Sequence, residues 1–300
     1  MENLVDRVYY TLQNYDIKRN IPLSDLTSFR IGGPAALVFR PHSAEDLAKA
    51  LMLCNKVQFP YHILGNGTNV LAPDAGFAGM IIRIDTPIIE PYFYKDAVTC
   101  DAGTSMTLLA QTSVRRGLMG LESMCGIPGT VGGACAMNAG AYGAEIRHVI
   151  TGVRIFRDGK VEDIKTKRTD FGNRTSRFCA PDTVVLTATF QLKPDDGTAK
   201  THMEEVIRAR KEKQPLAFPS AGSVFKRPAG RFAGALIEQC GLKGASIGGA
   251  QVSEKHAGFI INRGGATERD VLELIQLIQT RVFEATGVML EREVRLLDEV

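Results

Sequence analysis

One stretch of the chain reads Gly126-Ile127-Pro128-Gly129-Thr130-Val131-Gly132-Gly133-Ala134-Cys135-Ala136-Met137-Asn138-Ala139-Gly140-Ala141-Tyr142-Gly143. Six of its residues are glycines, and small side chains fill most positions between them. Glycine lets a backbone turn sharply and pass close to another group. A connecting loop seldom needs so many glycines, so this segment predicts a backbone that lies against a ligand.

A second glycine-rich turn, Gly65-Asn66-Gly67-Thr68-Asn69, lies upstream. An apolar run at 35–39, a helical pattern that begins after Ser43, and a strand-like run at 61–64 precede it, which indicates a β-α-β unit. Turn residues of this kind tolerate positive φ and expose backbone N–H groups, which suits a phosphate. Alone, such a turn is more often ordinary loop chemistry than a ligand contact. Together, the two segments favour a pair of loops that hold a diphosphate from both sides.

A dinucleotide fold of the Rossmann type is disfavoured. The pattern G-x-G-x-x-G that starts at Gly65 requires glycine at position 70, where the chain has Val70.

The remaining pattern predicts an α+β protein in two domains. Strands are expected at 80–85, 98–102 and 184–192, a helix at 105–116, and a hairpin around Asp158-Gly159 within 149–164. The turn formers at 194–198 predict a linker. Beyond it we expect a helix from about 202, a helix at 233–240, a strand at 258–262, and a long helix that starts at Thr267 and ends at Gly287.

The last segment, 288–297, alternates in the manner of a strand. Period two places Glu291, Glu293 and Arg295 on one face and Leu290 and Val294 on the other. An ion-pair ladder on the surface and a functional carboxylate are both consistent with that pattern.

The composition narrows the class of protein. With 300 residues, 44% hydrophobic, 23% charged and a net charge of +3, the chain is an ordinary folded protein with no basic run for nucleic acid. No window reaches the roughly 20 apolar residues of a membrane span, which favours a cytoplasmic protein. Six scattered cysteines predict free thiols, and we expect no metal site.

Several short phrases run in order over nearly the whole chain: Thr27-Ser28-Phe29-Arg30-Ile31-Gly32-Gly33, the two glycine segments, Ala221-Gly222-Ser223-Val224-Phe225 and Glu293-Val294-Arg295. Together they resemble one known family, the UDP-N-acetylenolpyruvoylglucosamine reductases (UDP-N-acetylmuramate dehydrogenases). The chain resembles the shorter branch of the family, because no extra segment between Phe190 and His202 holds the mobile tyrosine loop. It departs from the family at Asn173, where an aromatic residue is frequent.

The resemblance implies a two-lobed FAD-binding region of the vanillyl-alcohol-oxidase-like (PCMH) type and a smaller α+β substrate domain. The implied boundaries are an N-terminal helix at 1–24, the FAD-binding region at 25–194 with lobes of about 25–90 and 91–194, the substrate domain at 198–287, and a final strand at 288–300 that returns to the active site. The implied reaction is the NADPH-dependent reduction of the enolpyruvyl ether of a UDP-sugar to the lactyl ether. That reaction belongs to peptidoglycan synthesis, and hence to cell wall biogenesis, cell shape and cell division.

The resemblance also implies roles for residues. Non-covalent FAD would be held by Gly65, Asn66, Gly67, Thr68, Asn69, Gly126, Ile127, Pro128, Gly129, Thr130, Gly132, Gly133, Asn138, Gly140, Ala141 and Tyr142. Arg174 and Glu293 would stabilise the enolate that hydride addition creates, and Ser223 would deliver the proton. Lys213, Arg227 and His256 would reach the UDP-sugar, with the basic run at 208–213 near its phosphates; for that run a plain helix surface is an equal alternative.

Two other functions stay open at this point. One is an FAD-dependent oxidase or dehydrogenase of the same fold acting on another substrate. The other is a nucleotide-binding protein without catalysis. We expect no obligate protein partner and no nucleic acid partner.

Overall fold

The computed structural model describes residues 3–87 and 90–297. The chain forms two compact units that exchange segments. Unit 1 contains residues 1–18, 37–66 and 79–210, and unit 2 contains 19–36, 67–78 and 211–300. The domain boundaries given by the resemblance stay predictions. Because the units exchange segments, no single cut in the chain separates them.

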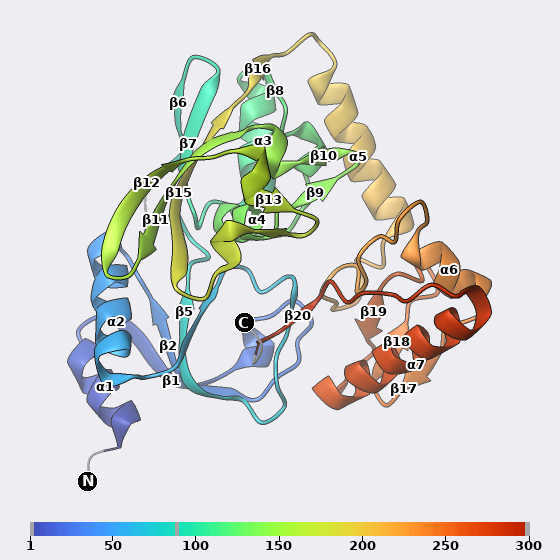
Figure 1. The fold of residues 1–300 in the computed structure, drawn as a ribbon, viewed down its shortest axis with the longest axis horizontal. Coiled ribbons are helices and arrows are strands. Elements are labelled where there is room, and N and C mark those ends of the chain that lie inside the picture. Colours follow the sequence, from blue (N-terminus) through green and yellow to red (C-terminus); the bar gives the residue numbers. More distant parts are fainter. Residues whose placement is uncertain (1–2, 88–89, 298–300) are drawn as a thin grey trace. The chain divides into compact units, whose positions relative to one another are not determined.

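A four-stranded sheet has the order β1-β2-β5-β3. Its strands are β1 (Asp16–Pro22), β2 (Pro34–Arg40), β5 (Phe77–Arg83) and β3 (Tyr61–Leu64). The predicted β-α-β pattern is confirmed, since α2 (Ala44–Val57) lies between β2 and β3 in the chain and Ser43 caps it by accepting from Asp46 N–H. Strand β3 pairs in parallel with β5, and Figure 1 shows α1 and α2 beside the sheet.

The predicted N-terminal helix over 1–24 is wrong in extent. Helix α1 covers Leu4–Leu12, and the residues from Asp16 to Pro22 form the strand β1. The helix buries Val8 and Leu12, whereas the following strand buries only Ile17 and then alternates between exposed and partly buried residues, as an edge strand does. Pairing with β2, a long-range contact, decides its structure.

Unit 1 also contains a five-stranded antiparallel sheet of order β12-β11-β15-β7-β6. Its strands are β12 (Lys160–Lys165), β11 (Ile150–Arg157), β15 (Thr183–Gln191), β7 (Ala97–Asp101) and β6 (Tyr92–Tyr94). The hairpin predicted at Asp158-Gly159 is confirmed, with φ values of 50° and 76°.

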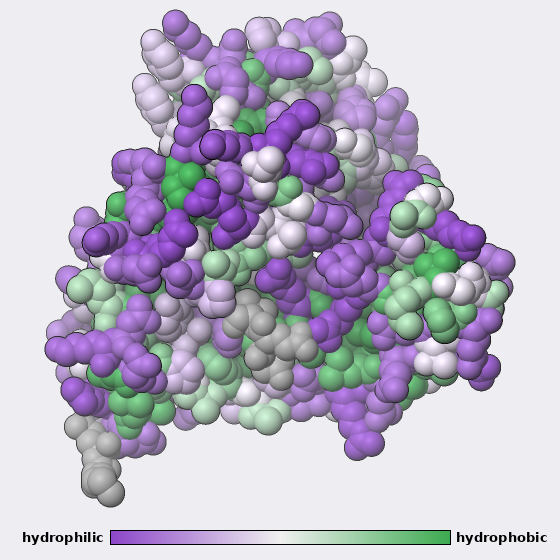
Figure 2. Space-filling view, viewed as in Figure 1, coloured by the Kyte–Doolittle hydropathy of each residue, from purple (hydrophilic) through white to green (hydrophobic). Residues whose placement is uncertain are grey.

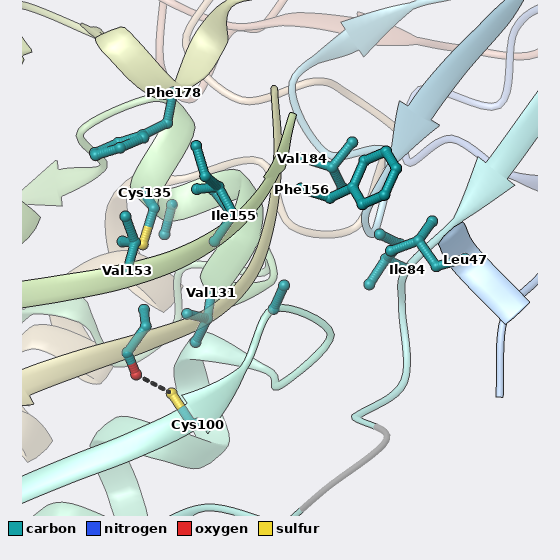
Figure 3. Packing of buried hydrophobic residues seen from close by; sticks show 14 of the residues in the cluster. Leu47, Ile84, Cys100, Val131, Cys135, Val153, Ile155, Phe156, Phe178 and Val184 are labelled. Atoms are coloured by element: carbon teal, nitrogen blue, oxygen red, sulfur yellow. Dashed lines mark hydrogen bonds between the residues drawn. The ribbon is translucent and has the colours of Figure 1, made fainter. Parts of the chain in front are cut away.

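Helices α3 (Met106–Arg115) and α4 (Val131–Ala136) complete unit 1 together with several two-residue strands. These are β8 (Leu118–Met119), β9 (Gly140–Ala141), β10 (Ala144–Glu145), β13 (Phe171–Gly172), β14 (Thr175–Ser176) and β16 (Lys193–Pro194). Figure 3 shows Val153 and Ile155 of β11 packed near Val131 and Cys135 of α4, in a core from which water is excluded.

Helix α5 (Ala199–Lys213) leads to unit 2, which has its own apolar core. Its three-stranded sheet consists of β17 (Ser246–Ile247), β18 (Ala250–Val252) and β19 (Ile260–Asn262), and its helices are α6 (Ala233–Gln239) and α7 (Glu268–Thr286). The predicted limits of α7 are confirmed: Thr267 and Asp270 form a capping box, and Gly287 ends the helix with φ 69°.

The predicted strand at 288–297 is mostly wrong. Only β20 (Arg295–Leu296) is a strand, paired in parallel with β4 (Val70–Leu71). The preceding residues are held by separate hydrogen bonds, from Lys226 N–H to Glu291 O and from Glu293 N–H to Val224 O, in place of a continuous ladder. The alternation does bury Leu290 and Val294, and the end of the predicted segment, 298–300, lies outside the described residues.

Hydrophilic side chains cover most of the face in Figure 2, and hydrophobic residues form small patches on it. Among the helices of the described residues, none combines the length and apolar character that a membrane crossing requires.

Candidate functional site

Unit 1 brings the two glycine segments into contact. A Cβ atom added at Gly65 would lie 2.5 Å from Thr130 Oγ1, closer than real Cβ contacts allow. Beside it, the Asn66 amide donates to the carbonyl oxygen of Pro128 at 2.7 Å. The two loops therefore form one cradle, and hydrogen is the only side chain that fits at Gly65.

The other glycines of this cradle have two different environments. A Cβ atom at Gly132 would lie 3.0 Å from Ala102 Cβ, and one at Gly140 would collide with the carbonyl oxygen of Ala144. By contrast, a Cβ atom at Gly143 would meet nothing within 4 Å, although its φ of 84° still favours glycine. The close approach predicted from the glycine count is thus partly an approach of backbone to backbone.

The Asn138 side chain holds the far end of the cradle. It is 1% exposed, donates to Glu145 Oε2 and the Gly172 carbonyl, and accepts from Arg147 N–H. The protein uses both of its N–H donors and its oxygen. A contact of Asn138 with a cofactor is therefore left to its backbone.

Arg174 lies in unit 1 at the tip of a short hairpin. Strands β13 and β14 pair Gly172 with Thr175, so Asn173 and Arg174 form the two-residue turn. Arg174 has a φ of 54°, a conformation that is uncommon outside glycine and often marks functional sites. Its guanidinium donates to the Gly140 carbonyl at 3.0 Å, which ties this residue to the glycine cradle. Asn173 is exposed and suits the turn, which gives a local reason for the departure from the family's aromatic residue.

Tyr142 is the exposed aromatic residue of the cradle. It has a φ of 51°, and 48% of its surface is accessible. A ring held in this way is available to pack on a planar ligand.

Unit 2 brings Ser223 close to Glu293. Ser223 forms an isolated antiparallel β-bridge with Phe259. The N–H of Val224 donates to the Gly258 carbonyl at 2.9 Å, and the N–H of Glu293 donates to the Val224 carbonyl at 2.7 Å. Ser223 is exposed and Glu293 is partly exposed. The Asn69 amide donates to the Glu293 carbonyl at 3.2 Å, which fixes the Glu293 backbone from a second side.

His256 is half-buried in unit 2. Its Nδ1 accepts from Gly258 N–H at 3.1 Å, and its ring meets Phe259 edge-on at 5.0 Å. Burial lowers the pKa of His256. The acceptor at Nδ1 places the proton of the neutral ring on Nε2, so His256 is arranged as a neutral hydrogen-bond donor.

Lys213 and Arg227 are exposed cations of unit 2. Lys213 is the last residue of α5. The Arg227 guanidinium lies over the Phe232 ring, 3.9 Å from its centre, and Phe232 itself is 59% exposed. This stack, which sequence reasoning missed, orients Arg227.

The structure therefore divides the predicted site residues between the units. Gly65, Asn66, the 126–142 members and Arg174 belong to unit 1; Gly67, Thr68, Asn69, Lys213, Ser223, Arg227, His256 and Glu293 belong to unit 2. FAD fits the residues of unit 1, because its glycine segments meet at Gly65 and Thr130 and the half-exposed ring of Tyr142 can pack on a planar group.

Comparison with known proteins gives two matching regions, and the first of them includes residues 67–78, which belong to unit 2. Residues 35–165 match the family model described as "FAD binding domain", and residues 214–297 match "UDP-N-acetylenolpyruvoylglucosamine reductase, C-terminal domain". The UDP-N-acetylenolpyruvoylglucosamine reductase of Clostridium botulinum (strain Hall) is 44% identical over 288 residues, covering 95% of this chain and 94% of the relative. That of Clostridioides difficile (strain 630) is 40% identical, covering 96% and 95%.

A solved structure extends the likeness to the fold. The crystal structure of the UDP-N-acetylenolpyruvylglucosamine reductase from Thermus caldophilus superposes with a TM-score of 0.78 at 36% identity, covering 93% of this chain and 98% of that one. The expected fold class, FAD cofactor and reductase activity are thereby confirmed. The chain belongs to the UDP-N-acetylenolpyruvoylglucosamine reductase family, whose FAD enzymes reduce an enolpyruvyl ether of UDP-N-acetylglucosamine in peptidoglycan precursor synthesis.

Proposed function

We propose that NADPH is the reductant of this enzyme and that Ser223, Arg174 and Glu293 carry out the chemistry on the enolpyruvyl group. The observation that carries the proposal is the pair of backbone contacts that hold Ser223 and Glu293 together around Val224. An exposed serine whose neighbour Val224 is bonded to the Glu293 backbone is held in a fixed place, which suits proton delivery to a substrate.

FAD, when bound and reduced, supplies a hydride. That hydride would add to the terminal carbon of the alkene and leave the electron pair of the double bond on the carbon that bears the carboxylate. Ser223 Oγ–H donates a proton to that carbon, so two C–H bonds replace one C=C π bond. The serine oxygen then regains its proton from solvent.

Arg174 and Glu293 stabilise the charge that develops on the substrate carboxylate. A guanidinium offers two parallel donors to a carboxylate and keeps its charge at every relevant pH. A protonated or hydrogen-bonded Glu293 supports the enolic form of the same group. The φ of Arg174 and its bond to Gly140 support a preorganised role for this side chain.

The same proposal covers the binding residues. The FAD-binding set predicted from the resemblance holds the cofactor, mainly through backbone where side chains such as Asn138 are already engaged. Lys213, Arg227 and His256 bind the UDP-sugar, Arg227 in the orientation that Phe232 gives it. A cytoplasmic location and the absence of an obligate protein partner stay predictions.

The test separates the two half-reactions by stopped-flow absorbance of the flavin. We expect Ser223→Ala to keep flavin reduction by NADPH near the wild-type rate and to slow reoxidation by the enolpyruvyl substrate by about 10²–10⁴-fold. The control is Ser246→Ala, which removes an exposed hydroxyl from β17. Equal damage to both half-reactions, or reoxidation at the wild-type rate, contradicts the role of Ser223.

A further inference from the structure

A guanidinium group lies against the first glycine of the cradle. Arg210 belongs to the part of α5 that lies in unit 1. A Cβ atom at Gly126 would lie 3.0 Å from Arg210 Cδ and 3.1 Å from its Nε, so the side chain runs along the backbone at Gly126. Gly126 has a φ of 89°, a backbone conformation that favours glycine over residues with a side chain.

The Arg210 side chain is partly buried, and no anionic group of the described residues pairs with its charge. Burial lowers the pKa of Arg210, and the two groups that oppose this shift, Tyr142 and Cys125, are not carboxylates. The guanidinium of Arg210 has no hydrogen bond or ion pair within residues 3–87 and 90–297. A half-buried charge without a partner carries a desolvation cost that an incoming anion would offset.

The neighbours of Arg210 indicate which anion. Both Gly126 and Tyr142 lie within residues 35–165, the part of the chain that matches the FAD binding domain. The basic run at 208–213 is divided by the structure, because Arg208 and Arg210 fall in unit 1, whereas Lys211 and Lys213 fall in unit 2. Arg208 and Lys213 are exposed, which distinguishes Arg210 from them.

We propose that Arg210 binds the diphosphate of FAD across the glycine cradle, and does not serve the diphosphate of the UDP-sugar. The guanidinium presents parallel donors that match phosphate oxygens, and Gly126 lets it reach them without a side chain in the way. Arg210 is thus a cofactor-positioning residue additional to those given by the resemblance. The inference rests on FAD binding and is independent of the roles proposed for Ser223, Arg174 and Glu293.

The experiment measures FAD release from the holoenzyme on dilution, followed by the rise in flavin fluorescence. We expect Arg210→Met to release FAD roughly 10- to 100-fold faster than the wild type, because a charge-assisted hydrogen bond to phosphate is lost. Added salt should accelerate release from the wild type more than from this variant. Lys200→Met, which removes an exposed charge from the same helix, is the control and should release FAD at the wild-type rate.

Two further arms decide between the possible roles. With FAD at saturation, the KM of Arg210→Met for the UDP-sugar should stay within twofold of the wild-type value. A large rise in that KM with unchanged FAD release would show that Arg210 binds the substrate, and would overturn the proposal. Arg210→Lys keeps the charge and should release FAD at a rate closer to the wild type than to Arg210→Met. If the lysine variant behaves like the methionine variant, or if neither changes FAD release, the charge of Arg210 is not what holds the cofactor and the proposal is wrong.

Discussion

The contact of Gly65 with Thr130 makes a quantitative prediction. In Gly65→Ala the new methyl group would lie 2.5 Å from Thr130 Oγ1, whereas ordinary contacts begin at 3.4 Å, so the Thr130 side chain or the two loops must move by roughly 0.9 Å. Overpacking of this kind costs about 1–3 kcal/mol, which corresponds to a factor of about 5 to 150 in the equilibrium that keeps the cradle closed. We expect a lower melting temperature and weaker retention of FAD.

A double-mutant cycle isolates that contact. Thr130→Ala removes the clashing oxygen, although it also removes the N-cap of α4, where Thr130 Oγ1 accepts from Gly133 N–H, at a cost of about 1 kcal/mol. The double variant should therefore be less destabilised than the sum of the single variants by about 1 kcal/mol or more. The assay is denaturant unfolding followed by flavin fluorescence, with Gly152→Ala as control, since its Cβ atom would lie an ordinary 3.4 Å from the Ile164 carbonyl. Additive effects, or a Gly65→Ala protein as stable as Gly152→Ala, would refute the reasoning.

Two more predictions concern Arg174 and His256. Arg174→Ala should slow flavin reoxidation by the enolpyruvyl substrate by about 10²–10³-fold, equivalent to about 2.7–4 kcal/mol, and leave flavin reduction by NADPH intact. The control is Arg168→Ala, because Arg168 is exposed. Full activity of Arg174→Ala would mean that Arg174 takes no part in catalysis. For His256, burial lowers the folded pKa below the ordinary value of 6.5, so the unfolded state binds more protons between the two values. Stability that is fully present above pH 6.5 should therefore decline as the pH falls through the folded pKa, and the wild-type melting temperature should drop more than that of His256→Gln between about pH 7.5 and 5.5. Parallel curves for the two proteins would mean that His256 does not titrate as its burial implies.

Local signals predicted the parts of the fold that depend on local physics. The capping box at Thr267, the stop at Gly287 and the hairpin at Asp158-Gly159 follow from a few neighbouring residues, and the structure confirms all three. The glycine count at 126–143 predicted a backbone that lies against a ligand; at Gly140 the approaching group is the carbonyl oxygen of Ala144, and the ligand contact stays a prediction.

The long-range features were not accessible in this way. The strand at Asp16–Pro22 exists because β2 is beside it, and β20 forms only where Arg295 meets Val70, a residue far away in the chain. For the same reason, no local pattern indicates that 19–36 and 67–78 join unit 2.

The candidate site shows the same division between local and long-range information. The candidate site residues were predicted from sequence motifs that resemble those of the family, and such motifs give no information on what surrounds each residue. The left-handed turn of Arg174, the stack of Arg227 on Phe232 and the path of Arg210 along Gly126 all depend on contacts between distant segments or on backbone geometry. The phrases therefore predicted the residues of the site, and the structure showed the surroundings of Arg174, Arg227 and Arg210.

The most direct test of the account is anaerobic titration of the purified flavoprotein, watched through flavin absorbance. NADPH should bleach the oxidised flavin band, and UDP-N-acetylenolpyruvoylglucosamine, added next, should restore it in stoichiometric amount, whereas UDP-N-acetylglucosamine should not. A flavin that NADPH reduces but the enolpyruvyl sugar fails to reoxidise would contradict the assignment of this chain as a reductase of that substrate.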